Sequence, residues 1–366
     1  MGLITLARWL GPWADATKAP TVDIVDEKVG DIRVRVFRRR GAKAAEAARD
    51  VGDDHRHSAP VATALRPPRG ATTFLIAPGL HYAGPDDVRM DRFCRILAAS
   101  GHHVVAPFVP DYLALTPNAR AISDFAKVFD ALPAGTKPVV FSISFGSLLA
   151  FALAAERGDA IDKLVIFGGY ADFHETMKFC LTGEVSTGRQ ATRDPLNQPV
   201  VLMNLLEHID HHQHTRDELV AGWRSYVERT WGRPEMKARD RFVAVAHELA
   251  PSIPDAVREL FLIGIGAQPG AWDLAVPALA QFDATALDPT PYLSRITNRV
   301  ELVHGMDDDV IPFEQSQVLA SRLVNARSVR VHITGLYGHT GSQRPPLTAL
   351  GKELVTMIRV LRVLSA

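Results

Sequence analysis

One serine of the chain has the surroundings of a nucleophile. Ser144 ends an apolar, strand-like segment, precedes an apolar helical one, and has the small residues Ser142 and Gly146 two positions away on either side. A sharp strand-to-helix turn needs small residues there, because larger side chains would collide. Such a turn lifts the hydroxyl off the sheet and directs the N–H of Phe145 toward an anion. The alternative is an ordinary strand–helix loop with a buried Ser-x-Ser-x-Gly.

A serine nucleophile needs a histidine base and an acid that orients the base. Two later segments contain these residue types in the order acid, then histidine. Asp308 lies in HGMDDDVIP, which follows one expected strand, and His339 lies in GLYGHTG, which follows the last expected strand. Open α/β sheets place their sites on loops after the carboxyl ends of strands. The three residues therefore have the types and positions needed for acyl transfer.

The segments around these residues are expected to alternate between strands and helices. Short apolar runs bounded by glycine or proline favour buried strands, and apolar residues three to four apart favour helices. Parallel strands need crossover connections, so the alternation predicts an α/β fold with a mostly parallel central sheet flanked by helices. The expected strands are residues 21–29, 31–38, 71–79, 102–108, 137–144, 162–169, 299–305 and 328–334.

The alternation of strands and helices stops between residues 171 and 290, where the pattern is helical. We therefore expect an α/β core formed by residues 1–170 and 291–366, and a helical cap over 171–290. A cap in this place would shape the pocket above the serine and exclude water from it. Within the core, residues 41–70 are polar, rich in alanine and end in prolines, which is typical of a long surface loop.

At this point the sequence resembles the α/β-hydrolase fold family. The resemblance covers residues 71–170 and 295–366 and hardly extends into the expected cap. In that family an H-G-x-x-D-x-x-x-P stretch after a late strand carries the acid, which corresponds to Asp308. The glycine–histidine pair after the last strand carries the base, which corresponds to His339. The resemblance therefore implies a catalytic triad of these two residues with Ser144.

Other aspartates compete with Asp308 for the role of the acid. Asp307 and Asp309 are its direct neighbours, and an error of one residue in a loop is easily made. Asp172 follows the expected strand at 162–169, a position that some relatives use. We expect Asp308 to be the acid, with the other three as alternatives.

An oxyanion hole needs a second N–H group, from the loop after the strand at 71–79. Many relatives read H-G-x there, whereas this chain has Pro78 in place of the histidine. The matching donors are the N–H groups of Leu80 and Phe145, and His81 is an alternative donor. Loss of one such donor typically lowers the rate by ~10²–10³-fold, so these groups matter nearly as much as the triad.

The sequence predicts no metal ion and no organic cofactor. The histidines at 208, 211 and 212 have the spacing of one helix face, and His214 follows them, but no H-E-x-x-H pattern or neighbouring cysteine supports a zinc site. We interpret them as exposed histidines. Lys and Arg (41) balance Asp and Glu (41), so no basic surface for nucleic acid is expected.

The cysteines and tryptophans can be interpreted as buried packing residues or as functional residues. Cys94 and Cys180 are too few for a disulfide framework and fit buried apolar positions, which agrees with a reduced compartment. Trp223, Trp231 and Trp272 could line an acyl pocket, although packing between cap helices explains each of them as well.

Residues 1–18 form an apolar, amphipathic segment. The segment has an early Arg8 but no clear cleavage site for a signal peptidase, and Leu6 stands where a myristoylation motif needs serine or threonine. We expect it to pack on the body of the protein, with weak contact to a membrane surface as the alternative. No apolar run reaches 18 residues, and a cytoplasmic location is the expectation.

Together these features predict a serine hydrolase. The resemblance implies a carboxylic ester of a lipophilic or small acyl group as the substrate, because esters are the most common substrates in that family. Carbon–carbon bond hydrolysis, thioester or peptide cleavage and acyl transfer use the same triad and remain alternatives. A non-catalytic ligand-binding protein with the same fold is the rival outside enzymes. The expected partner is a small-molecule ester, and the sequence leaves the oligomeric state open.

Overall fold

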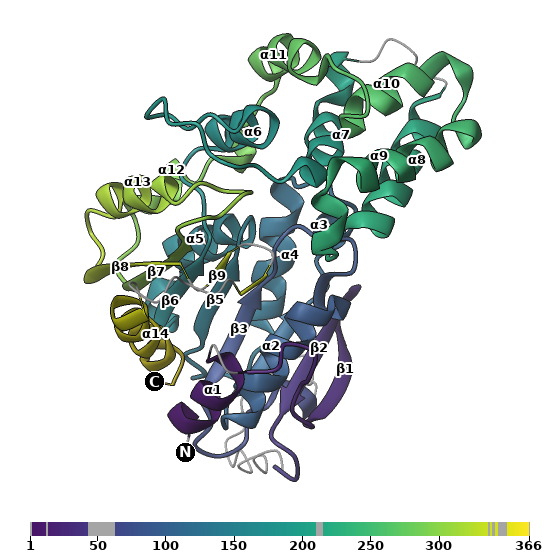
Figure 1. Cartoon of the computed structure of the whole chain (residues 1–366). Coiled ribbons are helices and arrows are strands. Elements are labelled where there is room, and N and C mark those ends of the chain that lie inside the picture. Colours follow the sequence, from purple (N-terminus) through teal and green to yellow (C-terminus); the bar gives the residue numbers. More distant parts are fainter. Residues whose placement is uncertain are drawn as a thin grey trace.

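The computed structural model describes residues 2–11, 14–42, 63–209, 215–335, 337–338, 341–342 and 350–365. Its centre is an eight-stranded sheet in the order β1-β2-β4-β3-β5-β6-β7-β8 (Figure 1). The strands β1 and β2 run antiparallel to their neighbours, and β3 to β8 run parallel to one another. The predicted fold class is therefore confirmed. The strands are β1 (Asp23–Val29), β2 (Ile32–Arg38), β3 (Thr73–Ala77), β4 (His103–Pro107), β5 (Val139–Ile143), β6 (Lys163–Phe167), β7 (Arg299–Gly305) and β8 (Ser328–Thr334).

Helices bury both faces of the sheet. Side chains alternate between the two faces of a strand, so Leu75 of β3 faces a core with α4, α5 and α13, whereas Phe74 and Ile76 face a core with α1, α2 and α14. The helices of the α/β layer are α1 (Gly2–Leu10), α2 (Val88–Ala99), α3 (Pro110–Leu113), α4 (Ala119–Asp130), α5 (Gly146–Arg157), α13 (Glu314–Arg322) and α14 (Leu350–Ser365). A short antiparallel pair, β9 (Tyr337–Gly338) and β10 (Gly341–Ser342), lies outside the main sheet.

Between β6 and β7 the described residues form helices and add no strand to the sheet. Most of these helices lie at one end of the molecule, opposite the two termini (Figure 1). Trp223 of α8 is fully buried among them, and its Nε1–H donates to the carbonyl oxygen of Phe261 at 3.2 Å. The elements are α6 (Phe173–Thr182), the 3₁₀ helix η4 (Pro195–Asn197), α7 (Gln198–Ile209), α8 (Arg216–Thr230), the 3₁₀ helix η6 (Pro234–Lys237), α9 (Arg239–Leu249), α10 (Asp255–Ile265), α11 (Ala271–Gln281) and α12 (Thr290–Leu293).

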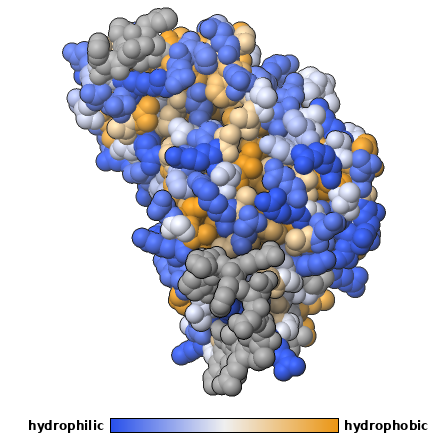
Figure 2. Space-filling view, turned by 180° about the vertical axis from the view of Figure 1, so that it is seen from behind, coloured by the Kyte–Doolittle hydropathy of each residue, from blue (hydrophilic) through white to orange (hydrophobic). Residues whose placement is uncertain are grey.

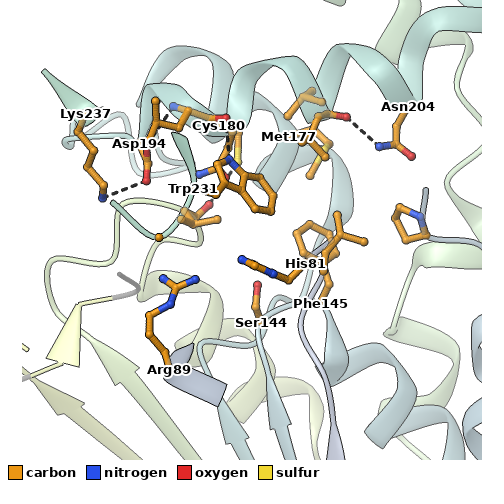
Figure 3. A pocket seen from close by; sticks show the side chains of 18 of the residues that line it. His81, Arg89, Ser144, Phe145, Met177, Cys180, Asp194, Asn204, Trp231 and Lys237 are labelled. Atoms are coloured by element: carbon orange, nitrogen blue, oxygen red, sulfur yellow. Dashed lines mark hydrogen bonds and ion pairs between the residues drawn. The ribbon is translucent and has the colours of Figure 1, made fainter. Parts of the chain in front are cut away.

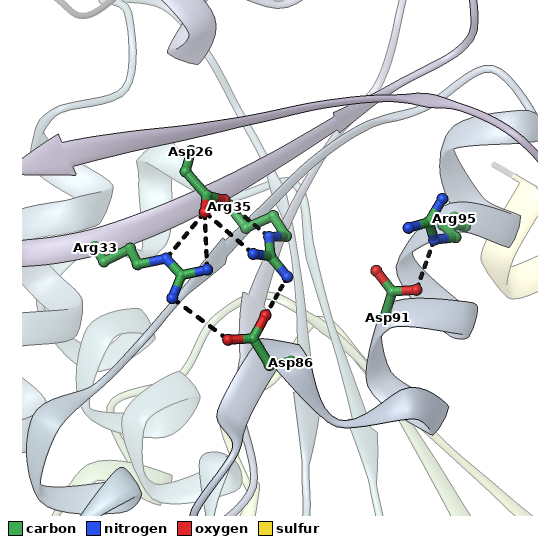
Figure 4. A network of polar contacts seen from close by, with 6 residues as sticks. All are labelled: Asp26, Arg33, Arg35, Asp86, Asp91 and Arg95. Carbon is green, nitrogen blue, oxygen red and sulfur yellow. Dashed lines mark hydrogen bonds and ion pairs between the residues drawn. The ribbon is translucent and has the colours of Figure 1, made fainter.

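The hairpin of β1 and β2 holds the segment that follows β3. Arg33 and Arg35 of β2 each contact Asp26 of β1 and also Asp86 of the 3₁₀ helix η2 (Gly84–Asp86) (Figure 4). Exposed ion pairs are individually weak, but two arginines shared between two carboxylates form a network. This network holds one end of the loop between β3 and η2, which contains Leu80.

The N-terminal segment packs on the protein, as expected. Leu6 of α1 is fully buried in the core shared with α2 and α14, and Arg92 of α2 donates to the carbonyl oxygen of Trp9 at 2.8 Å. No helix among the described residues is both long and apolar enough to cross a bilayer. The face seen in Figure 2 is covered mostly by hydrophilic side chains. Contact of residues 1–18 with a membrane surface stays a prediction.

Two expected elements differ in detail from the structure. The helix expected at 122–132 begins at Ala119, because the side chain of Asn118 accepts the N–H of Arg120 and starts the helix earlier. Part of the expected surface loop at 41–70 forms the 3₁₀ helix η1 (Thr63–Leu65), in which Ala64 and Leu65 are buried. Residues 43–62 of that loop lie outside the described residues.

Candidate active site

The turn at Ser144 has a strained backbone. Ser144 lies between the end of β5 and the start of α5, with φ at 53° in the left-handed region. A residue other than glycine in this conformation costs roughly 1–3 kcal/mol, so its surroundings must hold it there. The N–H of Ser144 donates to the carbonyl oxygen of Phe167 in β6 at 2.8 Å, and its own carbonyl oxygen accepts the N–H of Ser147 at 3.0 Å. The local pattern predicts this geometry.

The small neighbours of Ser144 are explained by close packing. A Cβ atom on Gly146 would stand 2.5 Å from the carbonyl oxygen of Pro78, and closer still to that of Ala77. The helix therefore begins directly against the end of β3, and only glycine leaves room. Ser142 is fully buried in β5, and its hydroxyl has no hydrogen-bond partner among the described residues. Its role here is to be small rather than to be polar.

The expected oxyanion donors lie beside Ser144. Gly79 passes so close that a Cβ on it would be 3.5 Å from the Cβ of Ser144, and Leu80 and Phe145 line the same pocket as Ser144. Within the described part of the chain, the N–H groups of Leu80 and Phe145 donate to no protein atom. Phe145 stands at the N-terminal, positive end of α5. The hydroxyl of Tyr112 donates to the carbonyl oxygen of Phe145 at 2.9 Å, and the N–H of Leu148 donates to it at 3.2 Å, which holds the following peptide, Phe145–Gly146, in place.

Asp308 lies on the loop after β7 and is almost fully buried. Its Oδ1 accepts the N–H groups of Val310 and Ile311, both at 2.9 Å, which orients the carboxylate within its own loop. Its Oδ2 lies 3.5 Å from Nε2 of His304. The ring of His304 lies 2.6 Å from the hydroxyl of Ser316 through Nδ1 and 2.8 Å from the carbonyl oxygen of Ile311 through Nε2. These contacts hold His304 in place as a support of the loop.

The rival aspartates have other contacts. Asp307 is exposed, Asp309 forms an ion pair with Lys237, and Asp172 accepts the N–H of Glu175 at the start of α6. These positions favour Asp308 as the acid. The expected base, His339, lies outside the described residues, as do the histidines at 211, 212 and 214.

A pocket opens above Ser144, between the end of the sheet and the helices that follow β6. Its volume is about 110 Å³. Figure 3 shows Ser144 at the end of its strand, with Met177, Cys180 and Trp231 across the pocket. The apolar part of the lining is Leu80, Phe145, Phe173, Met177, Leu196, Val200, Val201, Trp231 and Val310, and the polar part includes His81, Arg89, Asp194, Asn197, Asn204, Arg233 and Lys237. The site can therefore take a small, mainly apolar group beside the serine hydroxyl.

His81 lines this pocket as a neutral ring. Burial lowers the pKa of His81 to about 4, and the nearby carboxylate of Asp87 opposes this only in part. Its Nδ1 accepts the N–H of Ala83 at 3.1 Å, so Nε2 carries the proton and points to Asp87 at 3.4 Å. Nε2 makes no hydrogen bond with the described residues. Because Nδ1 already accepts a hydrogen bond and Nε2 already carries the proton, the ring has no free acceptor to remove a proton from Ser144.

A mostly parallel sheet in which a strand ends at a strained serine and turns directly into a helix defines one fold. The chain has the α/β-hydrolase fold. No protein-family model matches it. The chain is similar to a solved serine hydrolase from Cycloclasticus zankles, with 12% identity, a TM-score of 0.44, and coverage of 94% of this chain and 98% of that chain.

Two further solved structures are similar to this α/β-hydrolase chain. One is 2-hydroxy-6-oxo-6-phenylhexa-2,4-dienoate hydrolase from Rhodococcus sp. strain RHA1, with 16% identity, a TM-score of 0.40, and coverage of 93% of this chain and 100% of that chain. The other is acylaminoacyl peptidase from Pyrococcus horikoshii, with 10% identity and a TM-score of 0.43; the match covers 94% of this chain but only 41% of the peptidase. At these identities and TM-scores, the matches carry no argument about substrate.

The sequence alone does not predict several residues that line the pocket, among them Met177 and Lys237. Of the three tryptophans considered, Trp231 lines the pocket, whereas Trp223 is a core residue and Trp272 is partly exposed.

Burial raises the pKa of the Cys180 thiol to about 12, which agrees with an unreactive, buried cysteine. No group of three potential metal ligands occurs in the part of the chain that the structure describes. No sequence pattern near Lys237 indicates its contacts, because its partners, Asp194 and Asp309, lie far from it in the chain.

Proposed function

We propose that the chain is a serine hydrolase that cleaves a carboxylic ester with a small acyl group. The observation that carries this proposal is the left-handed backbone of Ser144 in the lining of a pocket, with two unpaired N–H groups beside it. Strain of this kind persists only where the surroundings impose it, and it gathers at active sites. A serine on a strained turn at the end of the sheet is the nucleophile arrangement of this fold.

In the proposed reaction, the Oγ of Ser144 attacks the ester carbonyl carbon. His339, which the sequence indicates as the base, takes the proton of the Ser144 hydroxyl. The N–H groups of Phe145 and Leu80 receive the negative charge that develops on the carbonyl oxygen. His339 then gives the proton to the leaving alkoxide, and water hydrolyses the acyl-enzyme. Asp308 orients the histidine and stabilises its charged form. The reaction requires no metal or organic cofactor.

The size of the pocket supports a small acyl group. A dry cavity of roughly 150 Å³ holds a benzene molecule, whereas this pocket has about 110 Å³. A palmitoyl chain would need a displacement of the helices between β6 and β7. We propose that residues 171–290 act as the cap that sets this size, because Met177, Val200 and Trp231 of that segment form the wall opposite Ser144.

The test is hydrolysis of p-nitrophenyl esters from acetate to palmitate, by the wild type and by Ser144→Ala. We expect the highest kcat/KM at short chains, and a loss of about 10⁴-fold or more in the variant. Ser142→Ala is the matched control, since this serine lies two residues earlier, near the end of β5, and does not line the pocket. If the folded wild type hydrolyses no ester, an ester is rejected as the substrate. Carbon–carbon, thioester or amide bonds then remain as the bonds that the protein could cleave. Equal activity in Ser144→Ala would reject the nucleophile.

A further inference from the structure

A buried charge cluster connects the helices after β6 with the loop that carries Asp308. Lys237, the last residue of η6, lies between two carboxylates: its Nζ is 3.0 Å from Oδ2 of Asp194 and forms a second ion pair with Oδ2 of Asp309 (Figure 3 shows the first pair). The side chain of Asp194 is 5% exposed and that of Asp309 is 16% exposed. Water and salt therefore screen these charges little.

The backbone and neighbouring side chains reinforce the same connection. The N–H of Asp194 donates to the carbonyl oxygen of Asp309 at 2.7 Å, and Oδ1 of Asp194 accepts the N–H of Leu196 at the start of η4. The thiol of Cys180 donates to the carbonyl oxygen of Val310 at 3.3 Å. The segment between β6 and β7 thus contacts the acid loop at Asp309 and at Val310.

We propose that Lys237 is a positioning residue of the site: by holding Asp309 against Asp194, it fixes the loop in which the adjacent Asp308 is oriented. Asp308 depends on that loop, because both N–H groups that its Oδ1 accepts come from residues 310 and 311. Lys237 acts through these neighbours and is not required to touch the reacting atoms. For its effect on the rate, the inference rests on the proposed function.

The charge of Lys237 is what makes the arrangement stable. Burial would lower the pKa of Lys237, but the carboxylates of Asp194 and Asp309 outweigh burial and raise the pKa above its usual value. The lysine is therefore charged at neutral pH. Without it, the carboxylates of Asp194 and Asp309 would lose the cation that joins them. Losing a partner strongly destabilises buried charges, so the contact between the two segments would weaken.

The first test measures hydrogen exchange in the full-length protein and needs no substrate. In Lys237→Met we expect the amides of residues 306–313 to exchange about tenfold faster than in the wild type, with no change in the β1–β2 hairpin. Lys178→Met is the matched control, because Lys178 pairs with Glu184 at 3.2 Å on the surface of the same helical segment. Unchanged exchange at 306–313 in Lys237→Met, or equal effects of both lysine variants, would overturn the inference.

The second test separates positioning from a general loss of stability. The double variant Lys237→Met/Asp309→Asn removes the repulsion, so we expect its Tm to recover toward that of the wild type. We still expect its kcat on a short ester to be about 10- to 100-fold low with KM within about threefold, because the loop is no longer held. Wild-type kcat in this folded double variant would overturn the inference. If the wild type cleaves no ester, the proposed function fails, and the exchange experiment still decides the role of Lys237.

Discussion

Gly146→Ala is the most direct test of the geometry of the turn at Ser144. The added methyl group would meet the carbonyl oxygens of Ala77 and Pro78, the latter at 2.5 Å, whereas carbon atoms at optimal separation lie about 3.5–4.0 Å from their neighbours. Because all of these contacts are to backbone atoms, no rotation of a side chain relieves them. The end of β3 and the start of α5 must therefore move apart by on the order of 1 Å.

This displacement has two expected consequences. Overpacking of this kind typically costs about 1–3 kcal/mol of unfolding free energy. The displaced strand end also leads into the loop of Leu80, and a misplacement of 1 Å in a site can cost about 10²-fold in rate. We expect kcat/KM on a short ester to fall by about that factor, well beyond what the loss of stability explains at 25 °C.

Urea unfolding and ester hydrolysis measure the two effects of Gly146→Ala separately. Gly158→Ala, just beyond the other end of α5, is the matched control: its nearest contacts are side-chain atoms of Asn298 and Thr297, at 3.1 and 3.6 Å, so a much smaller displacement accommodates the methyl group. We expect Gly158→Ala to keep its activity. A Gly146→Ala protein with the stability and kcat/KM of the wild type would refute the argument that the helix starts against the end of β3.

Three further predictions concern buried polar groups. Ser142→Ala removes a hydroxyl without a partner among the described residues, so urea unfolding should show equal or higher stability, and a loss above about 1 kcal/mol would contradict this. Tyr112→Phe removes one of the two hydrogen bonds to the carbonyl oxygen of Phe145, because the N–H of Leu148 still donates to it at 3.2 Å; it should cost about 0.5–1.5 kcal/mol together with a lower kcat, and unchanged stability and rate would show that this hydrogen bond is not needed. Burial lowers the pKa of His81 and of His103 to about 4, below the unfolded value of about 6.5. Their contribution is therefore complete above pH 6.5 and is lost as the pH falls toward 4, by up to about 1.4 kcal/mol per pH unit for each histidine. Unfolding free energies between pH 7.5 and 4.5 should show a shallower slope for His103→Gln and the wild-type slope for the exposed His174→Gln, and equal slopes in all three proteins would reject the assignment.

The parts of the fold and site that sequence alone predicted are those with a local cause. All five residues of β3 are buried, so the strand is a plain apolar run rather than an alternating one. The left-handed turn at Ser144 was predicted for the same kind of reason, because its requirement for small neighbours falls within five residues. The earlier start of α4 had a local signal too: Asn118 is a residue that caps helices, and it was overlooked.

The remaining features depend on residues that are distant in sequence. The burial of Leu65 follows from the core that it joins, and part of the anchoring of η1 comes from Arg38, which donates to the carbonyl oxygen of Thr63 at 3.1 Å. Nothing in residues 41–70 themselves reveals this. Lys237 and Asp309 are 72 residues apart, and each is an ordinary charged residue in its own segment. Only the packing of the helical segment against the acid loop gives their charges a common position.

The two halves of the pocket therefore have different origins and should respond differently to change. The α/β layer supplies Ser144, Phe145 and Leu80, whose positions are imposed by backbone strain and by the close approach of β3 to α5. The helical segment supplies the facing wall, including Met177 and Trp231, through ordinary side-chain packing. Strained backbone tolerates little variation, whereas an apolar wall tolerates exchange of one hydrophobic residue for another. We therefore expect the chemistry to depend on the layer, and the choice of acyl group to depend on the segment that the proposal has Lys237 hold against it.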